Sequence, residues 1–274
     1  MAVDDAGLRA AARGKRPPQG DPVVDRALAL LAAFDPAHRR LSLSELSRRS
    51  GTPLSTTRRL AERLLAWGAL ERSAAGGYVV GVRLWEIASL APRGLGLREV
   101  AMPFMDDLHE ATRQHVLLAV REGEEAVLVE RRSARAAVPV DYRVGGRLPL
   151  QMTAVGRVLL AHAPVELQER ILAGQGGGAS ADPVPQPAVL RRTLAEVRRS
   201  GVAIINRRNP APVVSVAAPV RDAADRVVAA LSVVLPAGGA NPRTIEPAVR
   251  AAARAVSRGL GAPGAAVKAG DARG

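Results

Sequence analysis

The chain has no cysteine and very few aromatic residues. Its 274 residues include only two Trp, two Tyr and two Phe. Without thiols there can be no disulfide, no thiolate metal site and no cysteine nucleophile. The four histidines, His38, His109, His115 and His162, show no metal-pair spacing. We therefore predict no metal and no cofactor, and expect the histidines on the surface or in the core.

Long apolar runs are also missing. No stretch of about 18 apolar residues occurs, so the sequence predicts no membrane span. The N-terminus contains Asp4 and Asp5 but no apolar segment, which is unlike a secretory signal. We therefore expect a cytoplasmic protein. The length and a hydrophobic content of 47% favour two folded domains.

Acidic residues are outnumbered by basic ones, and the formal net charge is +13. A positive field of this size favours polyanions such as nucleic acids. Lys15 and Lys268 are the only lysines, however, and the chain is rich in Ala. The Arg excess therefore reflects coding bias as much as selection for binding. Its distribution says more, because residues 39–63 contain seven arginines but only two acidic residues, Glu45 and Glu62.

Residues 41–67 have the pattern of two short helices joined by a tight turn. Ser42 and Glu45 have the spacing of a capping box at the start of the first helix. Gly51 suits the left-handed end of that helix. Thr52 then suits the N-cap of the second helix, with Pro53 in its first position.

The second helix has two chemically different faces. Its predicted buried stripe is Thr57, Leu60, Ala61 and Leu64. The opposite face presents hydroxyls and guanidiniums, which can contact base edges and phosphates in a major groove. This favours a DNA recognition helix over the alternative, a solvated face of a structural helix pair. The predicted DNA-contacting residues are Thr52, Ser55, Thr56, Arg58, Arg59 and Arg63.

The segments around this pair complete a winged unit. Residues 23–34 form an amphipathic helix whose predicted apolar stripe is Val24, Ala27, Leu28 and Leu31. Residues 68–72 and 78–80 form a hairpin, or wing, with Gly76 and Gly77 at the positive-φ positions of its turn. We place a disordered basic tail at 1–21, the winged helix-turn-helix domain at 22–81 and a helical linker at 82–96. Apolar positions on the linker, such as Leu84, Trp85 and Leu90, suit either dimer packing or burial within the chain.

The remaining chain alternates between strand-like and helical periods. We expect an α+β domain with a mostly antiparallel sheet at 97–261 and a loose tail at 262–274. Predicted strands are 115–122, 125–132, 138–144, 202–206, 213–220 and 226–235. Predicted helices are 97–113, 153–161 with Thr153 as N-cap, 165–172, 189–199 and 244–260. The apolar side predicted for the first of them is Val100, Phe104, Leu108 and Ala111.

In this order the segments resemble the IclR-type bacterial transcriptional regulators over roughly residues 22–260. The matching segments are 25–28, 43–47, 51–60, 77–81, 148–161, 201, 213–220 and 228–233. The resemblance implies a winged helix-turn-helix joined by a helix to a GAF-like effector domain. It also implies a homodimer or a dimer of dimers on double-stranded operator DNA, and a small-molecule effector that is frequently a carboxylate.

The resemblance also implies where the effector binds. Carried over to this chain, the effector-binding positions are Ala154, Val155, Ile205, Ser215, Ser232 and Val234. Some relatives have an acidic residue at 205, often Cys at 215, and Ser at 234. Backbone N–H groups at 154 and 155 can hold a carboxylate at a helix N-terminus. The apolar residues at 205 and 234 favour an apolar ligand body, although the two serines can also be merely small strand residues.

The sequence leaves two other functions open. GAF-like domains occasionally catalyse reactions on small acids, but this chain has no Gly-x-Ser-x-Gly motif and no phosphate loop at residues 176–178. We therefore predict a regulator and no enzyme. A sequence-nonspecific nucleic-acid-binding protein would fit the net charge, but it would not need a second domain of this length.

Overall fold

The computed structural model describes residues 22–91, 95–134, 137–140, 142–175, 182–208, 211–238 and 241–263. The predicted tail at 1–21 lies outside these residues, as does the tail from 264 on. The chain divides into two compact units, one ending at Ser89 and the other starting at Leu90. Within the described ranges, no helix is long and apolar enough to cross a membrane.

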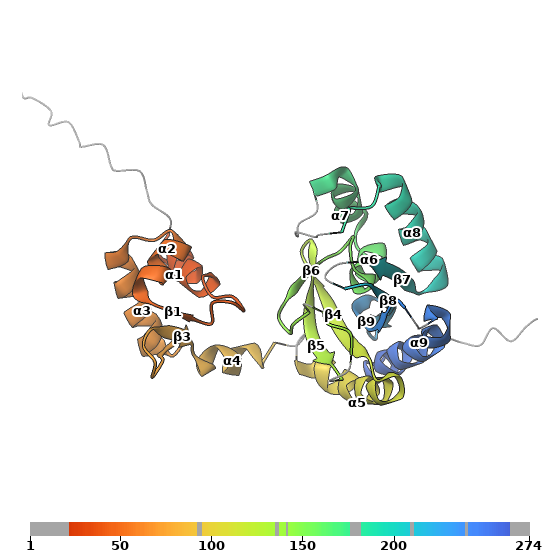
Figure 1. Ribbon diagram of the computed structural model, residues 1–274, viewed down its shortest axis with the longest axis horizontal. Helices are drawn as coiled ribbons and strands as arrows, with labels where there is room; N and C mark the ends of the chain where they lie inside the picture. The colour runs from red at the N-terminus through yellow and green to blue at the C-terminus, as the bar shows by residue number, and fades with distance from the viewer. Residues whose placement is uncertain are drawn as a thin grey trace, which may run out of the picture. The chain divides into compact units, whose positions relative to one another are not determined.

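The first unit is a winged helix-turn-helix, as predicted. Its helices are α1 (Val23–Ala32), α2 (Leu43–Ser50), α3 (Leu54–Trp67) and α4 (Val82–Ala88). Its small sheet has the order β1-β3-β2, with β1 at Arg40–Leu41, β2 at Leu70–Arg72 and β3 at Tyr78–Val80. The sequence reading missed β1, which adds a third strand to the wing (Figure 1).

Local signals explain the turn between α2 and α3. Ser42 and Glu45 form the predicted capping box, and Gly51 ends α2 with φ 67° and ψ 14°. The predicted N-cap Thr52 is wrong. Pro53 is the N-cap of α3, with φ −54° and ψ 142°, and the helix begins at Leu54. Proline fits there because its fixed φ suits the extended entry and its ring needs no hydrogen-bond acceptor.

The core of this unit is formed by α1, α2, α3 and the wing. Leu30, Leu46, Leu60 and Tyr78 are among its buried members. The predicted stripe of α3 is confirmed, since Thr57, Leu60 and Ala61 are buried and Leu64 is partly buried. The predicted stripe of α1 is wrong in part. Val24 and Leu28 are 66% and 57% exposed, and the side chain that α1 buries fully is Leu30.

The second unit is built on one six-stranded antiparallel sheet of order β6-β5-β4-β9-β8-β7, which confirms the predicted α+β class. Its strands are β4 (His115–Glu122), β5 (Glu125–Arg132), β6 (Arg147–Pro149), β7 (Ala203–Arg207), β8 (Val213–Arg221) and β9 (Val227–Pro236). The strand predicted at 138–144 is wrong. The described residues of that range form no strand, and Val138 and Val140 pack against the core instead.

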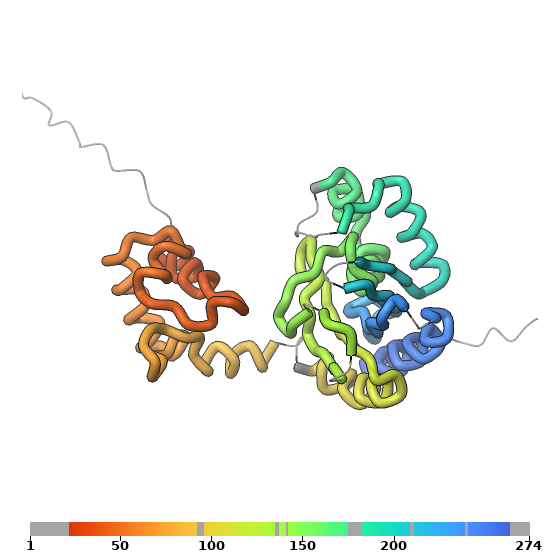
Figure 2. Tube along the Cα trace, in the orientation of Figure 1, coloured from red at the N-terminus to blue at the C-terminus, as the bar shows by residue number. Residues whose placement is uncertain are grey.

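Helices cover both faces of this sheet. They are α5 (Leu95–Thr112), α6 (Ala154–Ala161), α7 (Val165–Arg170), α8 (Pro187–Ser200) and α9 (Pro242–Gly259), with a π-helical turn at Ile171–Gln175. Figures 1 and 2 show α5 and α9 together along one face, and α6, α7 and α8 on the other. Each layer encloses its own apolar cluster.

The α5 helix packs with a different stripe from the one predicted. We expected Val100, Phe104, Leu108 and Ala111 to face the core. The structure buries Leu97, Ala101, Met105 and Leu108, while Val100 and Phe104 lie at the edge and Ala111 is exposed. The buried set is rotated by one position because α5 packs against both the sheet and the neighbouring helix α9.

Candidate DNA-binding face and effector site

The side of α3 opposite the core is open. Ser55, Arg58, Arg59 and Arg63 are exposed, and Thr56 is partly exposed. Among the described residues, none of the three arginines is paired with a carboxylate. A helix face with free guanidiniums and hydroxyls can donate hydrogen bonds to base edges and phosphates.

A network beneath this face holds the turn rigidly. The Thr57 hydroxyl, which is fully buried, donates to Thr52 O at 3.0 Å and to Pro53 O at 3.1 Å. The Ser47 hydroxyl donates to Thr52 O at 2.6 Å. Two helices that share a hydrogen-bonded turn keep a fixed angle, which a recognition helix needs in order to enter a groove in one register.

Thr52 itself lies inside this network. Its side chain is 4% exposed, its N–H donates to Ser47 O, and its carbonyl accepts from two hydroxyls. All its hydrogen-bonding groups therefore have partners within the turn. Of the six residues predicted to contact DNA, Thr52 is the one that the structure places away from the open face.

The wing packs closely against the end of α3. A Cβ on Gly81 would lie 2.1 Å from Gly68 O, so only glycine fits where the chain leaves the wing. Gly76 and Gly77 adopt the positive φ values predicted for the turn, 81° and 83°. The Arg40 guanidinium donates to Ala75 O at 2.7 Å, which places one more arginine beside the wing turn.

In the second unit, strand register brings three of the predicted effector residues into one row. Ile205 lies opposite Ser215, and Ser215 lies opposite Val234. Ser232 occupies the next row on the same face, because it lies two residues away on β9. All four side chains are at most 5% exposed.

The N-terminus of α6 joins this face of the sheet. Ala154 and Val155 belong to the same buried cluster as Ile205 and Val234. The predicted cap is confirmed, since Thr153 Oγ1 accepts from Gly156 N at 3.1 Å. The N–H groups of 154 and 155 find no acceptor within the described ranges. Two free N–H groups at a helix N-terminus suit an anion.

Sequence reasoning missed His115, the fourth member of the row. It lies opposite Val234 and is 3% exposed. Its Nδ1 is 2.8 Å from Ser133 Oγ, and its Nε2 is 2.6 Å from Val138 O. Burial holds its pKa below the ordinary value, so the ring is neutral at pH 7 and Nε2 donates to the carbonyl. Only the pairing of β4 with β9 could have revealed this position.

Gln151 is a second residue that the sequence did not single out. It lies just before α6 and is 4% exposed. Its side-chain Oε1 is buried and has no hydrogen-bond partner within the described ranges. Buried acceptors without partners are rare in folded proteins, and they often mark a place where a ligand or water donates.

Three cavities of the second unit lie away from these residues. One of about 460 Å³ lies beside Ile171–Leu172 and residues 184–187, and one of about 550 Å³ lies between α8 and α9. The third, of about 800 Å³, is lined by Arg221 and by arginines of α9. The predicted effector residues line none of these three, so a ligand between α6 and the sheet needs side chains there to move apart.

Known families match both units. Residues 23–74 match the family model described as the IclR helix-turn-helix domain. Residues 91–258 match the one described as the bacterial transcriptional regulator IclR C-terminal domain. Together these matches cover most of the described chain.

Individual relatives are similar to this chain over nearly their whole length. The repressor AllR of Klebsiella pneumoniae is 30% identical over 89% of this chain and 91% of its own. The glycerol operon regulatory protein of Streptomyces griseus is 31% identical over 87% and 96%. An IclR homolog from Microbacterium hydrocarbonoxydans, solved in complex with 4-hydroxybenzoate, is 33% identical with a TM-score of 0.80 over 87% and 99%. The chain therefore belongs to the IclR family of transcriptional regulators, with a helix-turn-helix DNA-binding domain and an effector-binding domain.

Proposed function

We propose that this regulator binds a pseudo-palindromic operator through the exposed face of α3, in the cytoplasm. Ser55, Thr56, Arg58, Arg59 and Arg63 contact DNA in this proposal, and Thr52 supports the turn beneath them. The observation that favours it is the open α3 face with unpaired arginines above a fixed turn. Two-fold symmetric sites match dimeric helix-turn-helix proteins, whose half-sites lie about one helical turn apart.

Footprinting on the DNA upstream of the gene, in about 0.15 M salt, tests operator binding. We expect protection of two half-sites and tighter binding than to random duplex of equal length. Equal affinity for both duplexes would favour the alternative, a sequence-nonspecific binder that the net charge of +13 alone would explain.

We further propose that the face between α6 and the β7–β8–β9 part of the sheet binds a small carboxylate with an apolar body. The N–H groups of Ala154 and Val155 hold the carboxylate, and the hydroxyls of Ser215 and Ser232 donate further hydrogen bonds. Ile205 and Val234 pack against the apolar part. The 33% identical relative that was solved with 4-hydroxybenzoate supports an aromatic hydroxy acid as the first candidate.

Thermal shift with matched ligands tests this site. We expect 4-hydroxybenzoate or benzoate to raise Tm, and the neutral 4-hydroxybenzamide to leave it unchanged. A ligand at 100 times its Kd adds about 2.7 kcal/mol of stability. Ser215→Ala should reduce the shift, whereas Ser89→Ala, in the first unit, should not. Turnover of the acid instead of binding would support the enzyme alternative.

We propose that two copies pair through the linker helix α4, because its large apolar side chains are exposed to solvent. Val82, Trp85 and Ile87 are between 48% and 64% exposed, and Leu90, two residues after the helix, is 79% exposed. Apolar groups clustered on a short helix are typical of a protein interface. A dimer of dimers on longer operators is compatible with the same pairing.

A further inference from the structure

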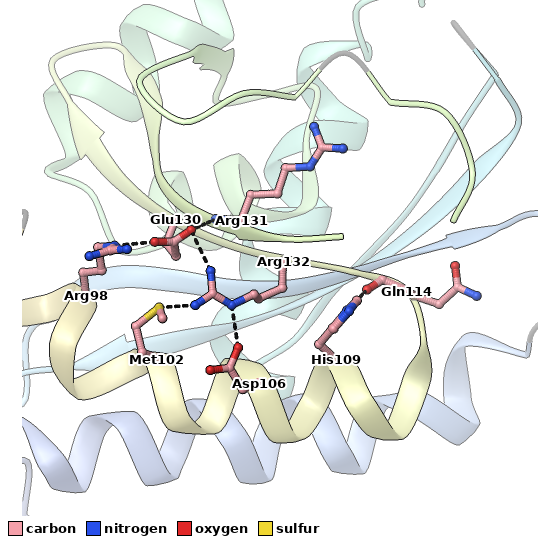
Figure 3. Close-up of polar contacts among 8 residues, drawn as sticks. All are labelled: Arg98, Met102, Asp106, His109, Gln114, Glu130, Arg131 and Arg132. Atoms are coloured by element: carbon pink, nitrogen blue, oxygen red, sulfur yellow. Dashed lines mark hydrogen bonds and ion pairs between the residues drawn. The ribbon is translucent and has the colours of Figure 1, made fainter. Parts of the chain in front are cut away.

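The second unit contains a partly buried charge cluster that neither proposed site uses. At its centre is Glu130 of β5, whose side chain is 8% exposed (Figure 3). Its Oε2 accepts from Arg98 Nε, and its Oε1 accepts from Arg132 Nη1 at 3.2 Å and from Arg131 N at 2.8 Å. Arg132 also donates to Asp106 Oδ1 at 2.5 Å and to Met102 Sδ at 2.7 Å.

The partners on α5 lie along one side of the helix. Arg98, Met102 and Asp106 are spaced by four residues, so they project from three successive turns. All three contact β5 through only two residues, Glu130 and Arg132. A short segment of one strand therefore adds polar contacts to the apolar packing that holds the first half of α5 against the sheet.

A β-bulge in β5 sets the directions of these side chains. Leu118 lies opposite Glu130 and Ala119 lies opposite Leu128, so Val129 is an extra residue without a partner. Glu130 therefore shares the face of Leu118, which packs with α5 and α9. In a regular strand, Glu130 would follow Leu128 and project toward α6, because side chains alternate.

The same bulge directs Arg131 to the opposite face, where the proposed effector row lies. Arg131 lies opposite Leu117, a member of the α6-side cluster. Its Nε donates to Ser133 Oγ at 2.5 Å, and its Nη1 donates to Tyr142 O. Ser133 Oγ in turn contacts His115, which stands in the row with Ile205, Ser215 and Val234. Three consecutive residues thus contact both layers of the unit.

We infer that the bulged segment 129–132 couples the effector side of the sheet to α5. A displacement on the α6 side that moves Arg131 also moves the backbone of Glu130 and Arg132, and so changes how firmly α5 is held. The α5 helix is the first helix of the second unit, so the chain from the DNA-binding unit enters through it. As a route for effector signalling this inference rests on the proposed effector site, and Glu130, Arg131 and Arg132 act in it as positioning residues.

Hydrogen exchange measured by mass spectrometry on the full-length protein, without DNA or added ligand, tests this coupling. Arg131→Ala removes contacts only on the α6 side. We expect amides of residues 98–108 in α5 to exchange about tenfold faster, with α8 unchanged. The control is Arg147→Ala, which removes an exposed arginine paired with Glu125 on the same sheet. It should leave α5 exchange at the wild-type rate.

A change on the α5 side must likewise be felt on the α6 side, because coupling between two sites is reciprocal. Glu130→Gln should speed exchange at residues 142–146, across the sheet. If circular dichroism shows Arg131→Ala to be unfolded, Ser133→Ala replaces it, since it removes a single hydroxyl. Faster exchange at 142–146 with unchanged α5 in the Arg131 or Ser133 variant would overturn the coupling. That result would not bear on the proposed effector site. Conversely, failure of every acid to bind would count against the effector site and not against the coupling measured by exchange.

Discussion

Replacing Gln151 by leucine should stabilise the protein, although a buried polar side chain is lost. The Oε1 of Gln151 is buried without a partner among the described residues. Leaving such an acceptor unsatisfied costs about 1–3 kcal/mol. Leucine has a similar size and needs no partner, so we expect a gain of about 1–2 kcal/mol once packing differences are included. For a unit of this size the gain corresponds to a rise in Tm of about 2–8 °C.

The matched control is Gln168→Leu. That side chain donates to Ala163 O at 2.8 Å and accepts from Arg198 Nη1 at 3.2 Å. Its removal should lower Tm, since two partners lose a hydrogen bond. Urea denaturation and differential scanning fluorimetry of both variants provide the comparison. A lower Tm for Gln151→Leu than for wild type would refute the view that this acceptor is unsatisfied in the free protein.

Two further predictions concern pH and assembly. Burial lowers the pKa of His115 and of His162, so the unfolded chain binds protons more readily than the folded one. Their contribution to the free energy of unfolding is full above 6.5, the pKa of histidine in the unfolded chain, and is lost as the pH falls below it. The urea midpoint should therefore drop between pH 7.5 and about 5.5. His115→Gln should reduce that drop, and an unchanged drop would contradict the assignment. For assembly, Trp85→Ser should shift the sedimentation equilibrium toward monomer, whereas Val165→Ser, at an equally exposed apolar site, should not. Dimers that persist in the Trp85 variant would place the interface elsewhere.

Local chemistry explains why the winged unit was predictable. The capping box, the left-handed Gly51 and the two-faced pattern of α3 depend on residues within a few positions of one another. The errors arose where local signals compete. Thr52 and Pro53 both suit a helix start, and the structure has Pro53 as the N-cap. Val138 and Val140 alternate like a strand, but they are only partly buried against the core, and the described residues around them form no strand.

The effector side was less accessible to sequence reasoning. Its residues were carried over from a family resemblance, and the cross-strand register then placed Ile205, Ser215 and Val234 together. The same register added His115, which lies opposite Val234 although the two residues are more than a hundred positions apart in the sequence. The bulge at Val129 moves each following side chain of β5 to the other face of the sheet, and no feature of the sequence predicts it.

The most direct measurement of the central claim compares sequence preference in two arginine variants. Affinity for the footprinted operator and for random duplex is measured by fluorescence anisotropy in about 0.15 M salt. Arg59→Ala or Arg58→Ala should cost about 1–3 kcal/mol on the operator and flatten the preference if that side chain contacts a base. Arg192→Ala, which removes an exposed charge from α8, should keep the preference. Wild-type operator preference in variants lacking both Arg58 and Arg59 would contradict recognition by the open face of α3.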